Sequence, residues 1–304
     1  MGILPELTSG DVESIIPNCQ VIGPKLNGGQ KIVFPCSISG EKCAIKFILV
    51  NDLKKQTNSV SSTKMEEIRG RAEREIAIMH EVNSTHIVKM GVVDLTSVTY
   101  NDQEILYYSE EWIDGTDLLT LLRNKGRLKA LSVIKLGLNI TDAISALWNT
   151  NNVHRDIKPQ NIIQRSSNGE FVLLDLGLAF DLDDKSLTQF GFVPGTRMYL
   201  SPEQLDVSKK RDIDFRSDLF SLGIVMYFMI TGIHPFYQNG MTDSELFSKI
   251  INEPIIPPAI LDSAIPKNVS DIICRLLNKQ PSERFRKCSI LERELNTILK
   301  GLEV

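Results

Sequence analysis

Apolar and polar residues alternate along three segments near the N-terminus, and this alternation predicts β-strands. The segments are rich in β-branched residues and are separated by turn residues, as the strands of a small antiparallel sheet usually are. They span residues 21–23, 26–34 and 42–48. Two later segments, 87–93 and 104–112, predict two further strands. Between these groups, residues 66–82 carry apolar side chains three or four positions apart, which predicts one helix.

The pattern changes to helical spacing after residue 117. Helices are predicted at residues 117–123, 129–150, 202–205, 217–231, 243–251, 268–277 and 289–300. Strands first and helices afterwards indicate an α+β fold of two lobes. We therefore expect a small antiparallel sheet with one helix in the N-terminal lobe, a mainly helical C-terminal lobe, and a cleft between them.

The domain boundaries follow from the same pattern. We expect an N-terminal extension at residues 1–18, where Pro5 and Pro17 oppose a long helix. The domain itself is expected at residues 19–297, with an N-lobe at about 19–112, a hinge at about 111–117 and a C-lobe at about 118–297. Residues 298–304 form a C-terminal tail.

Composition and charge are those of an ordinary soluble protein of 304 residues, 42% hydrophobic and 24% charged. The net charge of −4 implies no bulk attraction to nucleic acid or to anionic membranes. The number of cysteines, five, is odd, and no C-x-x-C pair occurs, which favours a reduced, cytoplasmic location. The most apolar run, residues 219–233, is too short to span a membrane and predicts a buried helix. The first residues lack the features of a signal peptide.

Polar side chains of a particular kind are grouped at residues 153–161. Asp156, Lys158 and Asn161 lie within one predicted loop, and Asp175 follows the next short apolar strand. Carboxylate and amide oxygens are ligands that Mg²⁺ prefers, and an ammonium group favours phosphate. This set of side chains suits the task of holding a metal-bound phosphate near a hydroxyl group.

The spacing His-Arg-Asp-x-x-x-x-Asn is the catalytic-loop pattern of protein kinases. The sequence resembles the eukaryotic-type (Hanks-type) serine/threonine protein kinases over residues 19–297, and it looks most like a stand-alone bacterial member. The resemblance implies that Asp156 orients the attacking hydroxyl and accepts its proton. It assigns Mg²⁺, or Mn²⁺, to Asn161 and Asp175. It implies that Lys158 neutralises the transferring phosphoryl group and that Thr196 bonds to Asp156 or Lys158.

The resemblance also implies an ATP site in the N-terminal lobe. Lys46 is assigned to the α- and β-phosphates, with Glu75 as its ion-pair partner from the helix at 66–82. Val33, on the preceding strand, and Ala44, on the same strand as this lysine, are assigned to the nucleotide.

The segment 107–118 resembles the hinge of the family. The resemblance implies that Glu111 and Ile113 present backbone groups to adenine and that Asp117 reaches the ribose hydroxyls. Glu110 then stands where the family often has a bulky apolar gatekeeper. A buried glutamate needs a partner or a proton, so we expect either an unusual polar contact or a register that differs by one residue.

The glycine-rich loop departs from the family pattern G-x-G-x-x-G-x-V. Counted back from Val33, Gly28 fits the second glycine, whereas Leu26 and Lys31 replace the first and third, and Gly29 adds a flexible site. We expect an altered lid over the nucleotide. Lys31 either adds a contact to phosphate or is exposed to solvent.

Downstream motifs favour protein substrates. Ser201-Pro202-Glu203 resembles the peptide-positioning motif of protein kinases, and Glu203 is expected to pair with Arg284. Small-molecule kinases generally lack this arrangement. Asp218 is expected to anchor the catalytic loop from a buried helix.

Regulation by phosphorylation is a further hypothesis, because an arginine, Arg155, precedes Asp156. The usual phosphosite position holds Phe192, so Ser186 and Thr188 are the nearest candidates.

The sequence therefore predicts an ATP-dependent serine/threonine protein kinase, able to phosphorylate itself, whose partners are protein substrates and neither nucleic acid nor membrane. Two alternatives remain open. One is a pseudokinase that serves as an ATP-binding scaffold, which the depleted glycine loop favours. The other is a kinase of small molecules.

Overall fold

A computed structural model describes residues 6–27, 31–52, 62–176, 180–181, 197–206 and 213–303 of the chain. The chain divides into two compact units. The first contains Met1–Glu81 and Val88–Ile113, and the second contains Val82–Ile87 and Asp114–Val304. The last passage of the chain from one unit to the other falls between Ile113 and Asp114.

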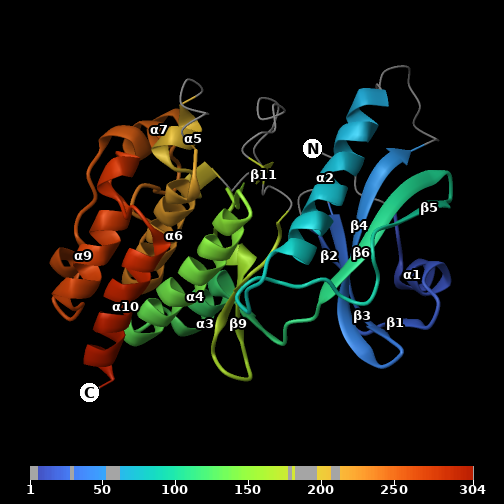
Figure 1. Cartoon of the computed structure of the whole chain (residues 1–304), viewed down its shortest axis with the longest axis horizontal. Coiled ribbons are helices and arrows are strands. Elements are labelled where there is room, and N and C mark those ends of the chain that lie inside the picture. The colour runs from blue at the N-terminus through green and yellow to red at the C-terminus, as the bar shows by residue number, and fades with distance from the viewer. Residues whose placement is uncertain are drawn as a thin grey trace. The chain divides into compact units, whose positions relative to one another are not determined.

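The first unit is built on a six-stranded antiparallel sheet (Figure 1). Its main path runs in the order β1-β3-β4-β6-β5, and β2 pairs with β3. The strands are β1 (Cys19–Val21), β2 (Leu26–Asn27), β3 (Lys31–Ile38), β4 (Glu41–Asp52), β5 (Thr96–Tyr100) and β6 (Gln103–Glu111). Ser39 and Gly40 join β3 to β4 with φ of 52° and 90°. Positive φ at both central residues is what a two-residue hairpin of the favoured twist requires.

One face of this sheet is apolar and forms the core of the first unit. Alternate residues of β3 and β4, among them Phe34, Ile45 and Phe47, lie on this face because successive side chains of a strand point to opposite sides. The rings of Phe34 and Phe47 meet edge to face with 5.8 Å between their centroids. The helix α2 (Ser62–Glu81) lies on the other face of the sheet (Figure 1).

The segment before the first strand completes this apolar core. Residues Ser9–Ile15 form a short helix, α1, and Leu7, Val12 and Ile16 are buried in the core. Thr8 caps α1 in a reciprocal capping box with Asp11, and the hydroxyl of Tyr100 donates to Asp11 Oδ1 at 2.7 Å. The part of the expected N-terminal extension that the structure describes, residues 6–18, is therefore folded onto the core of the first unit. Two turns of helix are too short for periodicity to reveal, but the spacing Thr-x-x-Asp is the signature of a capping box.

The strand expected at residues 87–93 is also absent from the described structure. Only isolated bridges occur there, between Ile87 and Leu173 and between Met90 and Glu110. The chain passes from the second unit to the first between Ile87 and Val88, so the first residue of this apolar run bridges to Leu173 while the residues after it belong to the first unit. β5, which was not predicted, borders β6 on the side opposite to β4.

The second unit is mainly helical (Figure 1). Its helices are α3 (Leu118–Lys125), α4 (Ala130–Asn149), α5 (Pro202–Leu205), α6 (Phe215–Thr231), α7 (Asp243–Asn252), α8 (Pro258–Leu261), α9 (Lys267–Leu276) and α10 (Cys288–Leu302). α6 is buried along almost its whole length, as the apolar run predicted, and it packs against α4 and α9. Gly223 permits the close approach of α9, since a Cβ there would lie 2.8 Å from Leu276 Cβ.

Two small sheets accompany these helices. A three-stranded sheet has the order β10-β9-β7, formed by β10 (Phe171–Leu173), β9 (Ile162–Arg165) and β7 (Gly115–Asp117). A two-stranded sheet pairs β11 (Phe180–Asp181) with β8 (Asn152–Val153). β8 and β9 bracket the predicted catalytic loop, so both of its ends are fixed by backbone pairing.

Among the described helices, α4 alone is long and apolar enough to cross a membrane, with a hydropathy of 1.4 over 18 residues. Half of that window is buried inside the protein, where α4 packs against α6 and α10. A core helix passes the same test, so composition alone gives weak evidence for a membrane span.

We predict that Val12→Ala destabilises the first unit although Val12 lies in the expected extension. Val12 is fully buried, so losing two methyl groups and leaving a cavity should cost about 1.5–3 kcal/mol. The measurement is urea unfolding followed by circular dichroism. Val92→Ala is the matched control in the same unit, because Val92 is 46% exposed. Equal effects of the two substitutions would contradict the packing of α1 in the core.

Candidate active site

A buried carboxylate holds the loop at residues 153–161 in shape. Asp218, in the first turn of α6, accepts hydrogen bonds from the backbone N–H groups of His154 and Arg155, both at 2.8 Å. Arg155 has a φ of 66°, a left-handed conformation that costs energy for a non-glycine residue and persists only where its surroundings enforce it. The expectation that Asp218 anchors this loop is confirmed. Burial raises the pKa of Asp218, and the hydrogen bonds from the two backbone N–H groups oppose this effect.

His154 links the loop to the strand that precedes Asp175. Its ring is completely buried, and its Nδ1 accepts a hydrogen bond from the backbone N–H of Asp156 at 3.2 Å. The other ring nitrogen, Nε2, lies 3.1 Å from the carbonyl oxygen of Leu174. A neutral imidazole with Nδ1 as acceptor carries its proton on Nε2, so Nε2 donates to Leu174.

The structure brings Asp156, Lys158 and Asn161 together. Lys158 Nζ donates to Asp156 Oδ2 at 2.7 Å. Asn161 Nδ2 donates to the same oxygen and to the carbonyl of Asp156, both at 3.0 Å. The second carboxylate oxygen, Asp156 Oδ1, is buried and has no hydrogen-bond partner in the described part of the chain. One oxygen of Asp156 is thus fixed by side chains of its own loop, and the other can accept a further hydrogen bond.

Asp175 lies one residue beyond a backbone contact to Asn161. The N–H of Leu174 donates to the carbonyl oxygen of Asn161 at 2.8 Å, and Asp175 then turns the chain with a φ of 61°. Aspartate tolerates this conformation better than most residues. Because Asn161 Nδ2 faces Asp156, its Oδ1 is the atom that can face a metal ion.

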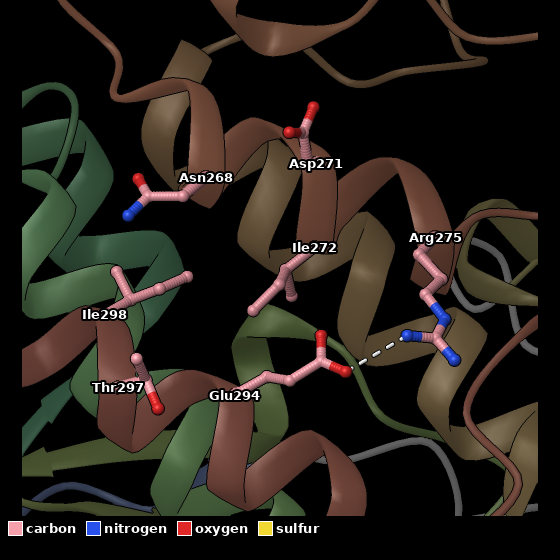
Figure 2. Close-up of a pocket in the computed structure, with 7 residues that line it drawn as sticks. All are labelled: Asn268, Asp271, Ile272, Arg275, Glu294, Thr297 and Ile298. Atoms are coloured by element: carbon pink, nitrogen blue, oxygen red, sulfur yellow. Dashed lines mark hydrogen bonds and ion pairs between the residues drawn. The ribbon is translucent and has the colours of Figure 1, made fainter.

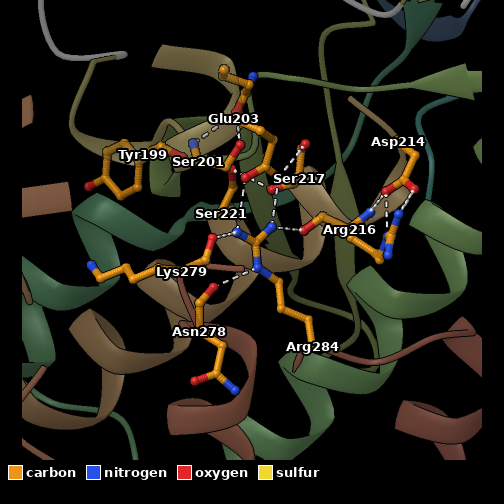
Figure 3. A network of polar contacts seen from close by, with 11 residues as sticks. Tyr199, Ser201, Glu203, Asp214, Arg216, Ser217, Ser221, Asn278, Lys279 and Arg284 are labelled. Atoms are coloured by element: carbon orange, nitrogen blue, oxygen red, sulfur yellow. Dashed lines mark hydrogen bonds and ion pairs between the residues drawn. The ribbon is translucent and has the colours of Figure 1, made fainter. Parts of the chain in front are cut away.

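Glu203 and Arg284 form the ion pair that the sequence predicted (Figure 3). Arg284 Nη1 and Nη2 donate to the two oxygens of Glu203 at 2.7 and 3.0 Å, and both side chains are buried. Ser217 Oγ adds a bond to Glu203 Oε1 at 2.7 Å. Burial raises the pKa of Glu203, but the hydrogen bonds and charge of Arg284 outweigh this effect, so the pKa lies below its usual value.

Arg284 also bonds to three backbone carbonyl groups, from two segments of the chain (Figure 3). Its guanidinium donates to the carbonyl oxygens of Arg216, Asn278 and Lys279. A planar guanidinium has five donors in a fixed geometry, and here it satisfies a carboxylate and carbonyl groups together. Arg284 therefore fixes Ser201–Leu205 against the start of α6.

Val33, Ala44 and Lys46 share one face of the sheet in the first unit. They alternate with Phe34, Ile45 and their neighbours, which fill the apolar core on the opposite face. The register pairs Val33 with Lys46 across β3 and β4. The structure thus places these three predicted nucleotide residues together on the face that α2 adjoins.

The partner of Lys46 differs from the expectation. Glu75 accepts from Lys31 Nζ, at 2.7 Å to Oε1 and 2.5 Å to Oε2, whereas Lys46 Nζ lies 2.5 Å from Glu110 Oε1. The predicted Lys46–Glu75 pair is replaced because Glu110 brings a second buried carboxylate to this face. The unusual polar contact foreseen for Glu110 is present. Solvent exposure of Lys31 is wrong, since only 16% of its side chain is exposed.

The structure places the residues that were predicted to bind adenine and ribose, but it does not test those roles. The N–H of Glu111 donates to the carbonyl of Lys89 at 2.9 Å, and Ile113 is buried. Asp117 caps α3 by accepting from the N–H of Thr120 at 2.9 Å. Their contacts to adenine and ribose stay predictions. Other predicted residues lie outside the described part of the chain: Gly28, Gly29, Thr196, Ser186, Thr188 and Phe192.

A hollow of about 460 Å³ in the second unit lies elsewhere (Figure 2). It is lined by side chains of α9 and α10, with the Arg275–Glu294 ion pair of 3.1 Å at one side. No residue predicted from the sequence as catalytic, metal-binding or cofactor-binding lines it.

We predict that Glu203→Gln lowers the free energy of unfolding by about 3–5 kcal/mol, since it leaves the buried charge of Arg284 uncompensated. Urea unfolding at pH 7 measures this. Because the pKa of Glu203 is lowered in the folded protein, the stabilisation is present above the unfolded pKa near 4.5 and is lost as the pH falls through the folded value. The difference in the free energy of unfolding between the variant and the wild type should therefore shrink as the pH falls.

The matched control is Asp271→Asn, which removes the exposed Lys267–Asp271 pair of the same unit. Its cost should be about 0–1 kcal/mol. A cost for Glu203→Gln no larger than for this control would contradict the structural role of the buried pair.

Comparison with known proteins agrees with these features. A family model described as the protein kinase domain matches residues 27–295. A probable serine/threonine-protein kinase of Clostridium perfringens is 31% identical over 239 residues, which are 79% of this chain and 33% of that protein. Probable serine/threonine-protein kinase PknB of Bifidobacterium longum is 29% identical over 74% of this chain and 32% of its own length. Serine/threonine-protein kinase PknE of Mycobacterium tuberculosis is 28% identical over 81% of this chain and 41% of its own.

The chain thus spans about a third to two fifths of the length of these relatives. The family model covers most of the chain, and the fold has the sheet-rich and helical lobes of that family. The chain belongs to the protein kinase domain family, of the eukaryotic (Hanks) type.

Proposed function

We propose that the protein is a serine/threonine protein kinase, which transfers the γ-phosphoryl group of ATP to hydroxyl groups of serine or threonine in proteins. The observation that carries this proposal is the state of Asp156. Lys158 and Asn161 hold its Oδ2, while Oδ1 is buried and unpartnered in the described part of the chain. Such an oxygen can accept the hydrogen bond of a substrate hydroxyl.

Asp156 would then act on the proton of the substrate hydroxyl, and Lys158 on the negative charge of the phosphoryl group. Asp156 Oδ1 orients the hydroxyl and accepts its proton as the oxygen attacks phosphorus. Lys158 Nζ, already 2.7 Å from Asp156 Oδ2, neutralises negative charge on the transferring phosphoryl group. Catalysis of phosphoryl transfer depends mainly on such positioning and charge stabilisation.

The donor set fits a hard divalent cation. Asn161 has Oδ1 available because its amide nitrogen is used, and Asp175 adds an anionic oxygen. Mg²⁺ is usually bound by one or two protein oxygens together with phosphate. Mg²⁺ or Mn²⁺, when bound, would neutralise negative charge on the phosphate oxygens. Thr196, outside the described residues, is proposed to bond to Asp156 or Lys158.

For the nucleotide, we propose that Lys46 binds phosphate and that Val33 and Ala44 contact the base. The backbone of Glu111 and Ile113 is proposed to bind adenine, and Asp117 the ribose. Gly28 and Gly29 would bring backbone N–H groups to the phosphates.

The protein substrate and the location are proposals as well. The Glu203–Arg284 pair supports a protein substrate, since it fixes the segment that resembles the peptide-positioning motif. All five cysteines are free, which supports a reducing, cytoplasmic location. We propose neither a membrane nor a nucleic acid as partner. The hydrogen-bonded loop at residues 153–161 disfavours the alternative of a pseudokinase. That alternative was based mainly on the departure of the glycine loop from the family pattern.

We predict that Asp156→Ala and Asp175→Ala each lower kcat at least about a hundredfold, because each removes a group that acts on the reacting atoms. The assay is transfer of labelled phosphate from ATP to a generic basic protein in the presence of Mg²⁺. Phosphoamino-acid analysis should show phosphoserine or phosphothreonine. Asp271→Ala, at an exposed position of α9, is the control and should keep wild-type activity. Near-normal transfer by either active-site variant, or transfer to small alcohols alone, would refute the proposal.

A further inference from the structure

Four charged side chains gather on the face of the sheet that α2 adjoins. Lys46, Glu75 and Glu110 are buried, with 7%, 3% and 3% of each residue exposed, and Lys31 is nearly so. They come from β3, β4, α2 and β6, four elements of the first unit. We call them the charge quartet.

The quartet consists of two close ion pairs. Lys46 Nζ lies 2.5 Å from Glu110 Oε1. Lys31 Nζ lies 2.5 and 2.7 Å from the two oxygens of Glu75, and 3.1 Å from the hydroxyl oxygen of the buried Tyr108. The Lys31–Glu75 pair joins β3 to α2, and the Lys46–Glu110 pair joins β4 to β6.

The two departures from the family pattern in this region compensate each other. Lys31 stands where the pattern has the third glycine, and Glu110 stands at the position that is often an apolar gatekeeper. One adds a positive charge and the other a negative charge, so the quartet contains two of each. Either change alone would leave an uncompensated buried charge, which is strongly unfavourable. Their joint presence therefore indicates one feature rather than two independent changes.

Lys46 stabilises the negative charge of Glu110. Burial raises the pKa of Glu110, the positive charge of Lys46 lowers it, and the nearby charge of Glu75 raises it. The two carboxylates thus repel each other, and each requires its own ammonium group. This requirement explains why Glu75 takes Lys31 when Glu110 takes Lys46.

We propose that Glu110 and Lys31 are positioning residues for phosphoryl transfer: Glu110 orients the ammonium group of Lys46, and Lys31 holds Glu75 away from it. This inference rests on the proposed function, in which Lys46 binds the phosphates of ATP. An ammonium group has three donors, so Lys46 can keep its bond to Glu110 while it binds phosphate. Glu110 in this way replaces the carboxylate of the helix as the group that orients the lysine.

The test is a double-mutant cycle with Glu110→Met, Lys31→Met and the two combined, since methionine is similar in volume to both residues. Glu110→Met should lower kcat about tenfold or more, with a smaller change in KM for ATP, because it removes the carboxylate that orients Lys46 while Glu75 is still held by Lys31. Lys31→Met should cost less.

The double variant should regain about tenfold or more of the activity lost in Glu110→Met. With Lys31 removed, Glu75 is released to pair with Lys46. A purely structural role predicts the opposite, since a second loss of packing or charge would lower activity further. The increase on adding a second substitution is therefore the decisive readout.

The chain offers a matched control in the Arg69–Glu104 pair. It joins α2 to β6, two of the elements that carry the charge quartet, and its N–O distance is also 2.5 Å, but its side chains are 39% and 31% exposed. Arg69→Met, Glu104→Met and the double variant should stay within about twofold of wild-type kcat and combine additively.

Three results would overturn the inference: a double variant no more active than Glu110→Met, a Glu110→Met enzyme with wild-type kcat, or a Lys31→Met enzyme as inactive as Lys46→Met. Circular dichroism checks the fold of each variant. If Glu110→Met fails to fold, Glu110→Gln, whose amide has the size of the carboxylate, takes its place in the cycle. The proposed function fails separately, if wild-type protein transfers no more phosphate than Asp156→Ala.

Discussion

A charge buried in this protein must be compensated within hydrogen-bonding distance, and the functional parts of the structure depend on that constraint. Asp218 is compensated by two backbone N–H groups, and it thereby imposes a strained conformation on Arg155. Glu203 is compensated by Arg284, which fixes Ser201–Leu205. Each compensated carboxylate determines the geometry of a segment that would otherwise have few contacts to hold it.

α6 shows how one helix can fill the core and also carry buried polar side chains that fix other segments. Nearly all of its residues are buried, and the side chains that bond to Glu203, to the loop at residues 153–161 and to Tyr199 lie in its first two turns. There Ser217 bonds to Glu203, Asp218 to the catalytic loop, and Ser221 Oγ to the carbonyl of Tyr199 at 2.7 Å. An acidic side chain is also favoured near the positive end of a helix dipole. The apolar remainder of α6 packs against α4 and α9 and makes this end rigid.

The sequence predicted the helices of the second unit well, because their apolar spacing is long and regular. It also predicted the association of Asp156, Lys158 and Asn161, since these residues lie within one short loop. What it missed depends on contacts between distant segments. The apolar run at 87–93 has the composition of a strand, yet the division between the two units falls after its first residue, Ile87. Local pattern carries no information on that division.

The partners of Lys46 and Glu75 were missed for a related reason. A motif identifies residues one at a time, whereas the pairing of four charges depends on all four together. The signal was nevertheless present in the sequence, as an extra lysine and an extra glutamate at two positions where the family pattern has neither.

The position of α1 has a consequence for the order of folding. Residues near the N-terminus leave the ribosome first, but Asp11 bonds to Tyr100, 89 positions later, and the N–H of Glu6 to Gln103, 97 positions later. Contacts of such sequence separation form slowly, because a long loop must close before they contribute. α1 is synthesised before β5 and β6, so part of its packing is missing until these strands have been made, and during that interval the nascent chain exposes apolar surface that favours aggregation.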